Sequence, residues 1–228
     1  MWYFYGRKKK FVHTYQCPVH PLIIEPFAGS ASYSLHNGNW RRKVVLVERD
    51  PRLAALWRWV IRTATAADIW GFPDPVVGES TPHLLHILHS SSKRWWQYKN
   101  ITVTPQLLSS WTASKPYMAA CIPKVKHWEV IEGDYTCAPD VSATWFIDPP
   151  YQGDAGTGYL HGSDQIDYEA LGKWCISRTG QVIVCEGRGA NWLPFSPHYT
   201  LRSAAGKTSH EVCYTSMTDP QGSVLDLL

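Results

Sequence analysis

The sequence predicts an α/β protein with one doubly wound sheet and a smaller, mainly helical lobe inserted into it. Two observations favour this fold. Short apolar runs rich in β-branched residues alternate with helix-like segments, as they do where helices connect the strands of a sheet. The chain has 228 residues, of which 44% are hydrophobic, so it is long enough to bury one sizeable core and leave room for a lobe.

The first expected strand runs directly into a turn of small residues. Residues 22–32 read Leu-Ile-Ile-Glu-Pro-Phe-Ala-Gly-Ser-Ala-Ser, and Tyr33 to His36 then begin a predicted helix. Gly29 would let the backbone approach a ligand closely, while Ser30 or Ser32 would cap the helix. This strand, turn and helix together predict a ligand-binding unit.

A second apolar run, Lys43 to Val47, predicts the next strand, which ends in Glu48. Glu48 follows Gly29 by about 20 residues, the offset at which an acid binds ribose hydroxyls in nucleotide-binding α/β folds. The two motifs therefore predict a nucleoside pocket. Pro51 suits the first turn of the helix that follows. Four apolar residues fall on one face of that helix: Leu53, Leu56, Trp57 and Val60.

Residues 67–127 interrupt the α/β alternation. We therefore assign residues 1–66 and 128–228 to the main domain and residues 67–127 to the inserted lobe. The lobe begins with a stretch rich in proline and glycine, residues 71–82, which predicts a loop. Two short helical patterns follow, at Pro82 to Ser90 and at Thr104 to Trp111.

Aromatic and basic residues are interleaved within this lobe. Trp95 and Trp96, for example, follow Lys93 and Arg94 directly. Rings stack on bases and cations contact phosphate, so the pattern suits a surface that binds nucleic acid. Tryptophans in a small lobe also form its core, and the pattern fits both interpretations.

The most specific motif follows the expected strand Ala143 to Ile147, which ends in Asp148-Pro149-Pro150-Tyr151. Two successive prolines cannot continue a strand, so the chain turns at the edge of the sheet where α/β folds bind ligands. The Asp148 carboxylate and the Pro149 carbonyl would each accept one hydrogen of an exocyclic amine and so localise its lone pair for methylation. The Tyr151 ring would offer a stacking surface for an extruded base. The plainer alternative is a strand end with a Pro-Pro turn and a half-buried tyrosine.

The remaining segments continue the sheet and supply three further candidate residues. Asp134 follows the expected strand His127 to Ile131, and either caps a turn or faces a ligand. Tyr159 follows a glycine-rich loop, and either closes over the base or packs the loop. Lys207 either contacts phosphate or belongs to a polar hairpin turn. The other expected elements are a helix over Asp164 to Trp174 and strands over Gln181 to Glu186, Tyr199 to Ser203 and Glu211 to Ser216.

Together these motifs resemble those of the Dam-like group of S-adenosylmethionine-dependent DNA adenine-N6 methyltransferases, small members of which are encoded by phages. Met1 to Lys10 is similar to the group's N-terminal aromatic–glycine–lysine motif, and Phe27-Ala28-Gly29-Ser30 resembles its cofactor loop. Glu132-Gly133-Asp134-Tyr135 is similar to the motif that precedes the catalytic strand. Asp148-Pro149-Pro150-Tyr151 matches the catalytic tetrapeptide. The order of the motifs along the chain is also that of the group.

The resemblance implies a Rossmann-like, doubly wound mixed sheet of the class I S-adenosylmethionine-dependent methyltransferase type. It implies methyl transfer from S-adenosylmethionine to the N6 amine of adenine in DNA, with Asp148, Pro149, Pro150 and Tyr151 as catalytic residues. Glu25, inside the glycine loop, either binds the ammonium group of the cofactor or faces water. The expected cofactor-binding residues are Tyr5, Gly6, Lys8, Glu25, Phe27, Gly29, Ser30, Glu48, Asp134 and Asp148.

The expected partner is double-stranded DNA with the target base flipped out, or else single-stranded DNA. The net charge is only +3, so nucleic-acid contacts must come from clustered residues. The candidates are Arg7, Lys9, Lys93, Arg94, Lys124, Lys126, Tyr159 and Lys207. Three alternatives keep the fold: methylation of cytosine N4, methylation of adenine in RNA, and a nucleic-acid-binding subunit without catalysis.

Cysteine usage and hydropathy indicate the expected setting. The six cysteines contain no Cys-x-x-Cys pair and no zinc spacing, which predicts reduced thiols, no metal, and the cytoplasm of a bacterial or phage-infected cell. No stretch is apolar enough to span a membrane, and the basic N-terminus lacks the apolar segment of a signal peptide. No membrane partner is therefore expected.

Overall fold

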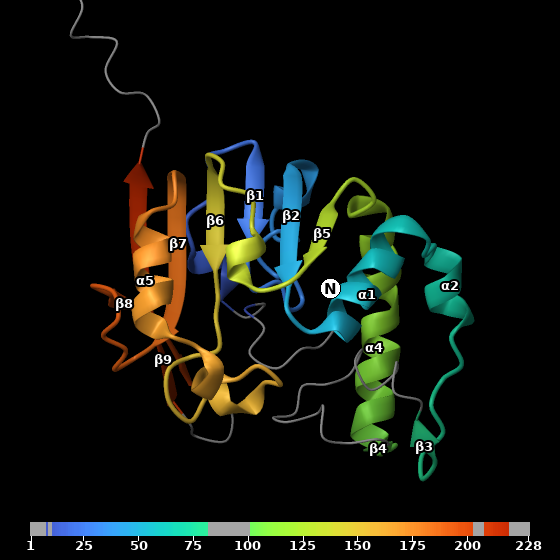
Figure 1. Cartoon of the computed structure of the whole chain (residues 1–228). Helices are drawn as coiled ribbons and strands as arrows, with labels where there is room; N and C mark the ends of the chain where they lie inside the picture. Colours follow the sequence, from blue (N-terminus) through green and yellow to red (C-terminus); the bar gives the residue numbers. More distant parts are fainter. Residues whose placement is uncertain (1–7, 9–10, 82–100, 203–207, 219–228) are drawn as a thin grey trace, which may run out of the picture.

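A seven-stranded mixed sheet forms the centre of the protein, in a computed structural model that describes residues 8, 11–81, 101–202 and 208–218 (Figure 1). In spatial order the strands are β5 (Glu129–Glu132), β2 (Lys43–Glu48), β1 (Leu22–Glu25), β6 (Ala143–Ile147), β7 (Gly180–Gly187), β9 (Thr208–Thr218) and β8 (Ser196–Arg202). The first five are parallel, whereas β9 is antiparallel to both β7 and β8. The predicted α/β fold with a mixed sheet is confirmed, and its arrangement is compatible with a Rossmann-like fold.

The described α-helices are α1 (Pro51–Arg62), α2 (Ala66–Gly71), α4 (Pro105–Cys121) and α5 (Tyr168–Ile176). A small antiparallel pair joins β3 (Ser80–Thr81) to β4 (Ile101–Thr102). Short 3-10 helices are η2 (Val12–Thr14), η3 (Asn39–Arg41), η5 (Ile122–Lys124), η6 (Tyr135–Cys137), η7 (Gly156–Gly158) and η8 (Ser163–Gln165). In the described part of the chain, every helix is too short or too polar to cross a bilayer.

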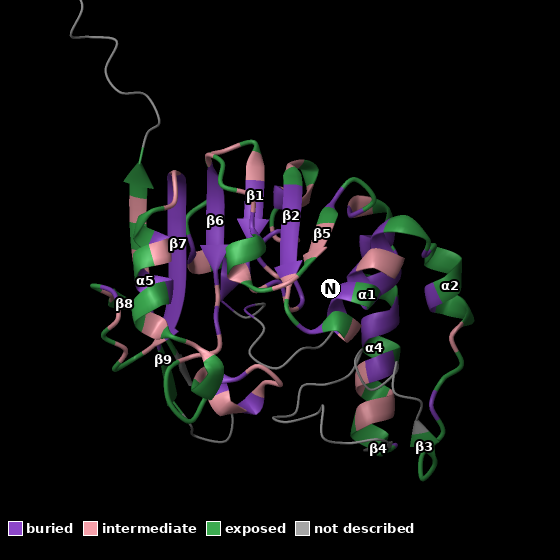
Figure 2. Cartoon of the chain, viewed as in Figure 1, coloured by how far each residue is buried: buried purple, intermediate pink, exposed green. Residues whose placement is uncertain are grey.

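Both faces of the sheet are covered, as a doubly wound fold requires. Neighbouring strand residues point to opposite faces: Ile23 belongs to an apolar cluster that includes Trp57 of α1. Ile24 belongs to a second cluster that includes Leu171 of α5. Figure 2 shows the central strands buried along most of their length. The sheet is therefore a rigid base for the loops at the ends of its strands.

Helix α1 begins immediately after β2, as predicted. The Asp50 side chain accepts a hydrogen bond from the Arg52 backbone N–H at 3.0 Å, and Pro51 occupies the first turn. The predicted apolar face is confirmed, since four side chains are buried: Leu53, Leu56, Trp57 and Val60. The cap fixes the end of β2, where Glu48 lies.

The predicted helix over Tyr33 to His36 is wrong. This segment forms turns, followed by η3. Asn37 and Gly38 have left-handed φ values of 43° and 83°, which a right-handed helix cannot accommodate. Because that helix does not form, the predicted role of Ser30 or Ser32 as its cap is also wrong.

The helix predicted over Asp164 to Trp174 starts later than expected. Asp164 belongs to η8, and α5 begins at Tyr168 because the Asp167 side chain accepts the Ala170 N–H at 3.0 Å. The three C-terminal strands are confirmed, as β7, β8 and β9. Each is longer than the apolar run that predicted it.

The described part of the inserted lobe shares its core with the main domain. The helix predicted over Thr104 to Trp111 is confirmed, and α4 continues beyond it to Cys121. Trp111 is fully buried, donates to Asp74 Oδ1 at 2.8 Å, and belongs to the same apolar cluster as Trp57. For Trp111, the interpretation as a core residue is therefore the one that fits. The helical pattern over Pro82 to Ser90 lies outside the described residues, as do Trp95 and Trp96.

Candidate functional site

A cavity of about 330 Å³ opens at the carboxyl ends of the central strands. Strands β2 and β5 lie on one side of β1, and β6 and β7 lie on the other, so the ends of β1 and β6 form the switch point at which open α/β sheets bind ligands. The volume is typical of small-molecule sites. Glu25 at the end of β1, Glu48 at the end of β2 and Asp148 just after β6 all line the cavity.

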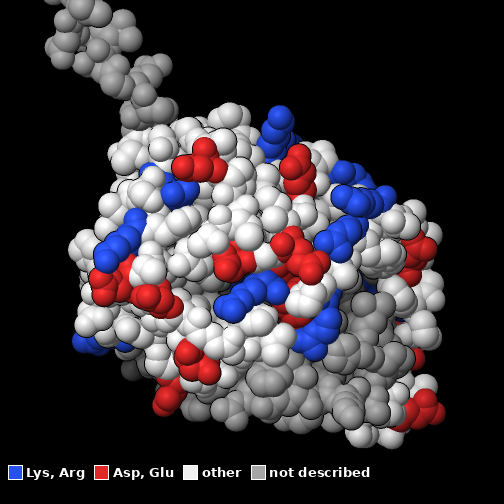
Figure 3. Space-filling model, viewed as in Figure 1, with Lys and Arg blue, Asp and Glu red and all other residues white. Residues whose placement is uncertain are grey.

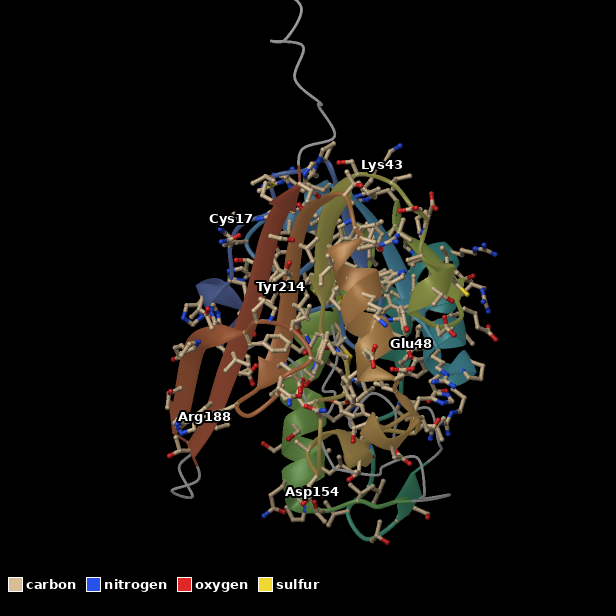
Figure 4. All side chains as sticks on the ribbon, turned by 60° about the vertical axis from the view of Figure 1, so that its left-hand side comes forward. Cys17, Lys43, Glu48, Asp154, Arg188 and Tyr214 are labelled. Carbon is tan, nitrogen blue, oxygen red and sulfur yellow. The ribbon has the colours of Figure 1, made fainter. Side chains whose placement is uncertain are left out.

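The glycine loop is tied to the acid at the end of β2. Gly29 has a left-handed φ of 46°, and its N–H donates to Glu48 Oε2 at 3.1 Å. The Asp50 N–H donates to Glu48 Oε1 at 3.0 Å. Burial raises the pKa of Glu48, labelled in Figure 4, to about 7, although these backbone hydrogen bonds act to lower it. The predicted pair of motifs therefore forms one wall of the cavity.

Glu25 is a buried acid, with 3% of its surface exposed. Its Oε1 accepts the Ser34 backbone N–H at 2.8 Å. Burial raises its pKa to about 7, the Ser34 hydrogen bond opposes this shift, and the negative charge of Asp148 adds to it. Because Glu25 lines the cavity, a cationic group bound there would favour its ionised form.

Asp134 caps a short helical turn and also lines the cavity. Its Oδ1 accepts from the Thr136 N–H at 2.9 Å and caps η6, and the same carboxylate lines the cavity. The hydrogen bonds from Thr136 lower its pKa. Beside it, the Phe27 and Tyr135 rings stack with centroids 5.8 Å apart. This end of the cavity thus combines an ionised acid with aromatic surface.

Asp148, which also lines the cavity, is ion-paired. Lys8 Nζ lies 2.7 Å from Asp148 Oδ1, and the two side chains are 5% and 21% exposed. Burial raises the pKa of Asp148 to about 6, and the Lys8 charge acts to lower it. For Lys8, burial alone would lower the pKa, but Asp148 and Glu211 raise it above its usual value. The pair holds Asp148 ionised at neutral pH.

The turn after Asp148 is held by several side chains. The Tyr168 hydroxyl donates to the Pro150 carbonyl at 2.6 Å, and the Gln152 N–H donates to Glu186 Oε1 at 2.6 Å. Pro149 is buried. Each contact comes from α5 or β7, so these neighbouring elements fix the tetrapeptide.

Tyr151 is half-buried, and described residues contact both its ring and its hydroxyl. The phenol donates to Glu211 Oε2, Lys8 Nζ lies 4.3 Å from the ring centroid, and the ring lies against Gly187 of β7. The predicted half-buried tyrosine is therefore confirmed, and Lys8 contacts both Tyr151 and Asp148. The stacking of a base on this ring stays a prediction.

Two acids of this site were missed by sequence reasoning. Glu211 was assigned to a scaffold strand, and Glu186 was treated as the last residue of a buried strand. Glu186 is fully buried, and burial raises its pKa to about 8. Its second oxygen, Oε2, has no hydrogen-bond partner among the described residues. The available signal was an acid at the end of an otherwise apolar strand pattern, which favours a buried polar role.

The structure brings most of the predicted cofactor-binding residues to one cavity. Those that line it are Lys8, Glu25, Phe27, Gly29, Ser30, Glu48, Asp134 and Asp148. Ser30 is buried, with its hydroxyl oxygen 3.2 Å from that of Ser32. Tyr159, the predicted lid residue, also lines the cavity. Tyr5 and Gly6 lie outside the described residues.

The predicted nucleic-acid contacts are less well supported. The Lys126 ammonium donates to the Val60 carbonyl at 2.9 Å and to the Ala64 carbonyl, so this exposed residue caps the end of α1. Lys124 Nζ lies 5.6 Å from the Trp40 ring centroid. Neither residue lines the cavity. The other basic candidates lie outside the described residues: Arg7, Lys9, Lys93, Arg94 and Lys207.

Charges of both signs surround the site. Figure 3 shows acidic and basic side chains side by side near the centre of this face, without a continuous basic surface among the residues described there. Within the described ranges, no group of three or more His, Cys, Asp or Glu residues is placed to hold a metal ion. The described side chains thus offer a ligand acids, aromatic rings and backbone groups.

Similarity to known proteins does not assign this site. No protein-family model matches the chain, and no curated protein has a detectably similar sequence. The function of the site is therefore argued from the residues that line it and from their contacts.

Proposed function

We propose that this protein is an S-adenosylmethionine-dependent methyltransferase that acts on the N6 amine of adenine in DNA. One observation carries the proposal. Eight residues expected to hold the cofactor, from five separate segments of the sequence, line a single cavity at the switch point of the sheet. A strand end with a Pro-Pro turn and no ligand would not require the glycine loop, Glu48 and Asp134 to meet Asp148.

The residues of the cavity fit the chemical groups of S-adenosylmethionine. Glu48 would accept hydrogen bonds from ribose hydroxyls, as an acid at the end of the second strand does in nucleotide-binding folds. Asp134, beside the Phe27 and Tyr135 rings, would accept from the adenine amine. Glu25, a buried acid without a charged partner among its described hydrogen bonds, suits the ammonium group. When bound, the cofactor supplies a methyl group attached to a cationic sulfur.

Asp148 would act on the amine that is methylated. Its carboxylate and the Pro149 carbonyl would each accept one N–H, which localises the lone pair and directs it toward the methyl group. This role requires an ionised carboxylate, and a pKa of about 6 leaves Asp148 mostly ionised at pH 7. Tyr151 would present its ring to the base.

Mass spectrometry of nucleosides tests the proposal. Unmethylated DNA and RNA are each incubated with S-adenosylmethionine and the wild-type protein, Asp148→Asn or Asp148→Ala. We expect N6-methyladenine in DNA with the wild type, reduced at least about 100-fold in both variants because a preorganised acceptor is lost. Asp140→Asn is the matched control, since Asp140 pairs with Arg178 at the surface and away from the cavity.

The other outcomes separate the alternatives. N4-methylcytosine or methylated RNA would keep the site and change the substrate. Bound cofactor without methylation of either polymer would favour a subunit that needs a partner. Failure of the wild type to bind S-adenosylmethionine in calorimetry would refute the proposal.

A further inference from the structure

Glu211 is an acid of the C-terminal hairpin that reaches the tetrapeptide. It is directly opposite Gly187 in the antiparallel pairing of β9 with β7, so the two residues point to the same face of the sheet. Only 7% of Glu211 is exposed. A buried carboxylate is costly unless it is paired and hydrogen-bonded, and Glu211 has both kinds of partner.

The partners of Glu211 are two residues of the proposed active site. Its Oε2 accepts the Tyr151 hydroxyl hydrogen and lies 3.8 Å from Lys8 Nζ. Lys8 Nζ is also 2.7 Å from Asp148. One ammonium therefore lies between two carboxylates, one in the tetrapeptide and one in β9.

Gly187 makes the position of the Tyr151 ring depend on β7 as well as on β9. A Cβ added at position 187 would lie 3.2 Å from Tyr151 Cδ2. The ring therefore lies against the backbone of β7 while its hydroxyl is held by β9. These two contacts leave the ring little freedom to rotate or shift.

We propose that Glu211 is a positioning residue, which fixes the Tyr151 ring as the stacking surface for the target base and shares Lys8 with Asp148. This inference rests on the proposed function, because it assigns Glu211 a part in the same reaction. Glu211 acts through Tyr151 and Lys8 and does not contact the reacting atoms.

The shared lysine gives Glu211 an influence on Asp148. The negative charge of Glu211 raises the pKa of Asp148, after the larger effect of burial. Removing that charge should therefore move the acidic limb of the pH–rate profile to lower pH. The other titratable groups that interact with Asp148 are Lys8, Tyr15, Glu25, Tyr151, Cys185 and Glu186, and they are unchanged in a Glu211 variant.

The test combines kinetics with nuclear magnetic resonance of ring-labelled tyrosine. Tyr151→Phe assigns the Tyr151 resonance, which we expect to shift in Glu211→Gln and in Glu211→Ala. Glu211→Ala should lower kcat about tenfold or more, the value of a buried charge-assisted hydrogen bond, with a smaller change in KM. Tyr151→Phe should remove the same contact, so the double variant should lose little beyond the larger single loss.

The pH profile distinguishes positioning from a general structural defect. The acidic limb should move to lower pH in Glu211→Gln and stay in place in Tyr151→Phe. Glu169→Gln, in the exposed ion pair with Lys173 on α5, is the control and should change neither resonance nor rate. If Glu211→Ala does not fold, Glu211→Gln, which keeps the size of the side chain, decides the question.

Two results would overturn the inference while the wild type methylates DNA: an unchanged Tyr151 resonance in the Glu211 variants, or losses that simply add in the double variant. If the wild type methylates neither polymer, the proposed function fails and the resonance alone decides. A shift would then support positioning of Tyr151 by Glu211, and its absence would refute it.

Discussion

The two sides of Asp148 use acids in different ways. On the β1 and β2 side, Glu25 and Glu48 accept backbone N–H groups of the glycine loop and its neighbouring turns and face the cavity. On the β7 and β9 side, Glu211 accepts the hydroxyl hydrogen of Tyr151, and Glu186 accepts the N–H of Gln152, the residue after the tetrapeptide. The first side forms a wall for a ligand, whereas the second side fixes the residues that would act on the substrate.

A residue near the end of a strand can therefore contribute to a site without facing its cavity. Glu186 and Glu211 do not line the cavity, yet each holds one residue of the segment that follows Asp148. Substitutions on the two sides should therefore affect different properties of the enzyme. Changes at the wall should weaken cofactor binding, and changes on the β7 and β9 side should lower the rate of reaction.

The largest effect is expected at the wall. Glu48→Gln replaces an acceptor oxygen with an amide nitrogen beside N–H donors, so we expect the affinity for S-adenosylmethionine to fall about tenfold or more. Isothermal calorimetry measures this directly. Glu132→Gln is the matched control, because Glu132 is the parallel neighbour of Glu48 on β5 and does not line the cavity. An equal loss in both variants would contradict a specific role for Glu48.

Lys8 connects the two sides, and its replacement should have the next largest effect. Lys8→Met removes the charge that lowers the pKa of Asp148, so that pKa should rise by about 1.5 or more. A larger fraction of Asp148 is then protonated at pH 7. Methylation should fall about fivefold there and recover as the pH is raised toward 9.

The pH–rate profile of Lys8→Met checks this expectation. Lys43→Met is the control, because Lys43 is exposed at the opposite end of β2 from Glu48 (Figure 4). A loss of activity that is equal at every pH would show that Lys8 acts on something other than the ionisation of Asp148.

Much of the wall was predictable because its residues are close in sequence to the elements that place them. The run Lys43 to Val47 predicted β2, and Asp50 with Pro51 predicted the start of α1. These local signals fixed the position of Glu48. The helix expected after Gly29 failed through an equally local signal, since Asn37-Gly38 favours left-handed backbone.

The other side could not be predicted in this way. Glu211 is 60 residues from Tyr151, and Glu186 is 34 residues from Gln152. The Glu186 contact depends on β7 pairing with β6, and the Glu211 contact depends on β9 inserting between β7 and β8. A sequence pattern does not give that order. Lys126 shows the same limit, because its bonds to the end of α1 join residues more than 60 positions apart.

Glu186 should have a smaller effect, on stability. Burial raises its pKa from 4.5 to about 8, so between these values the folded protein holds a proton that the unfolded chain releases. Stability therefore falls as the pH rises from about 5 to 8. Glu186→Gln stays neutral and should melt a few degrees higher than the wild type at pH 8.

Melting temperatures at pH 5 and pH 8 test this sign. The difference between Glu186→Gln and the wild type should shrink at pH 5, where the wild-type carboxyl is protonated in the folded protein. Glu169→Gln, at an exposed position on α5, should melt like the wild type at both values. A variant that is less stable than the wild type at pH 8 would indicate that the Glu186 charge stabilises the tetrapeptide.

The smallest effect on the β7 and β9 side is expected from Gly187→Ala. The added methyl group would lie 3.2 Å from Tyr151 Cδ2, close enough to displace the ring by a few tenths of an ångström. If the ring positions the base, kcat should fall about two- to threefold while cofactor affinity is unchanged. Gly71→Ala is the control, because nothing lies within 4 Å of a Cβ there. A fall in cofactor affinity would instead mean that the β7 and β9 side also supports the wall of the cavity. The two sides would then not have separate roles.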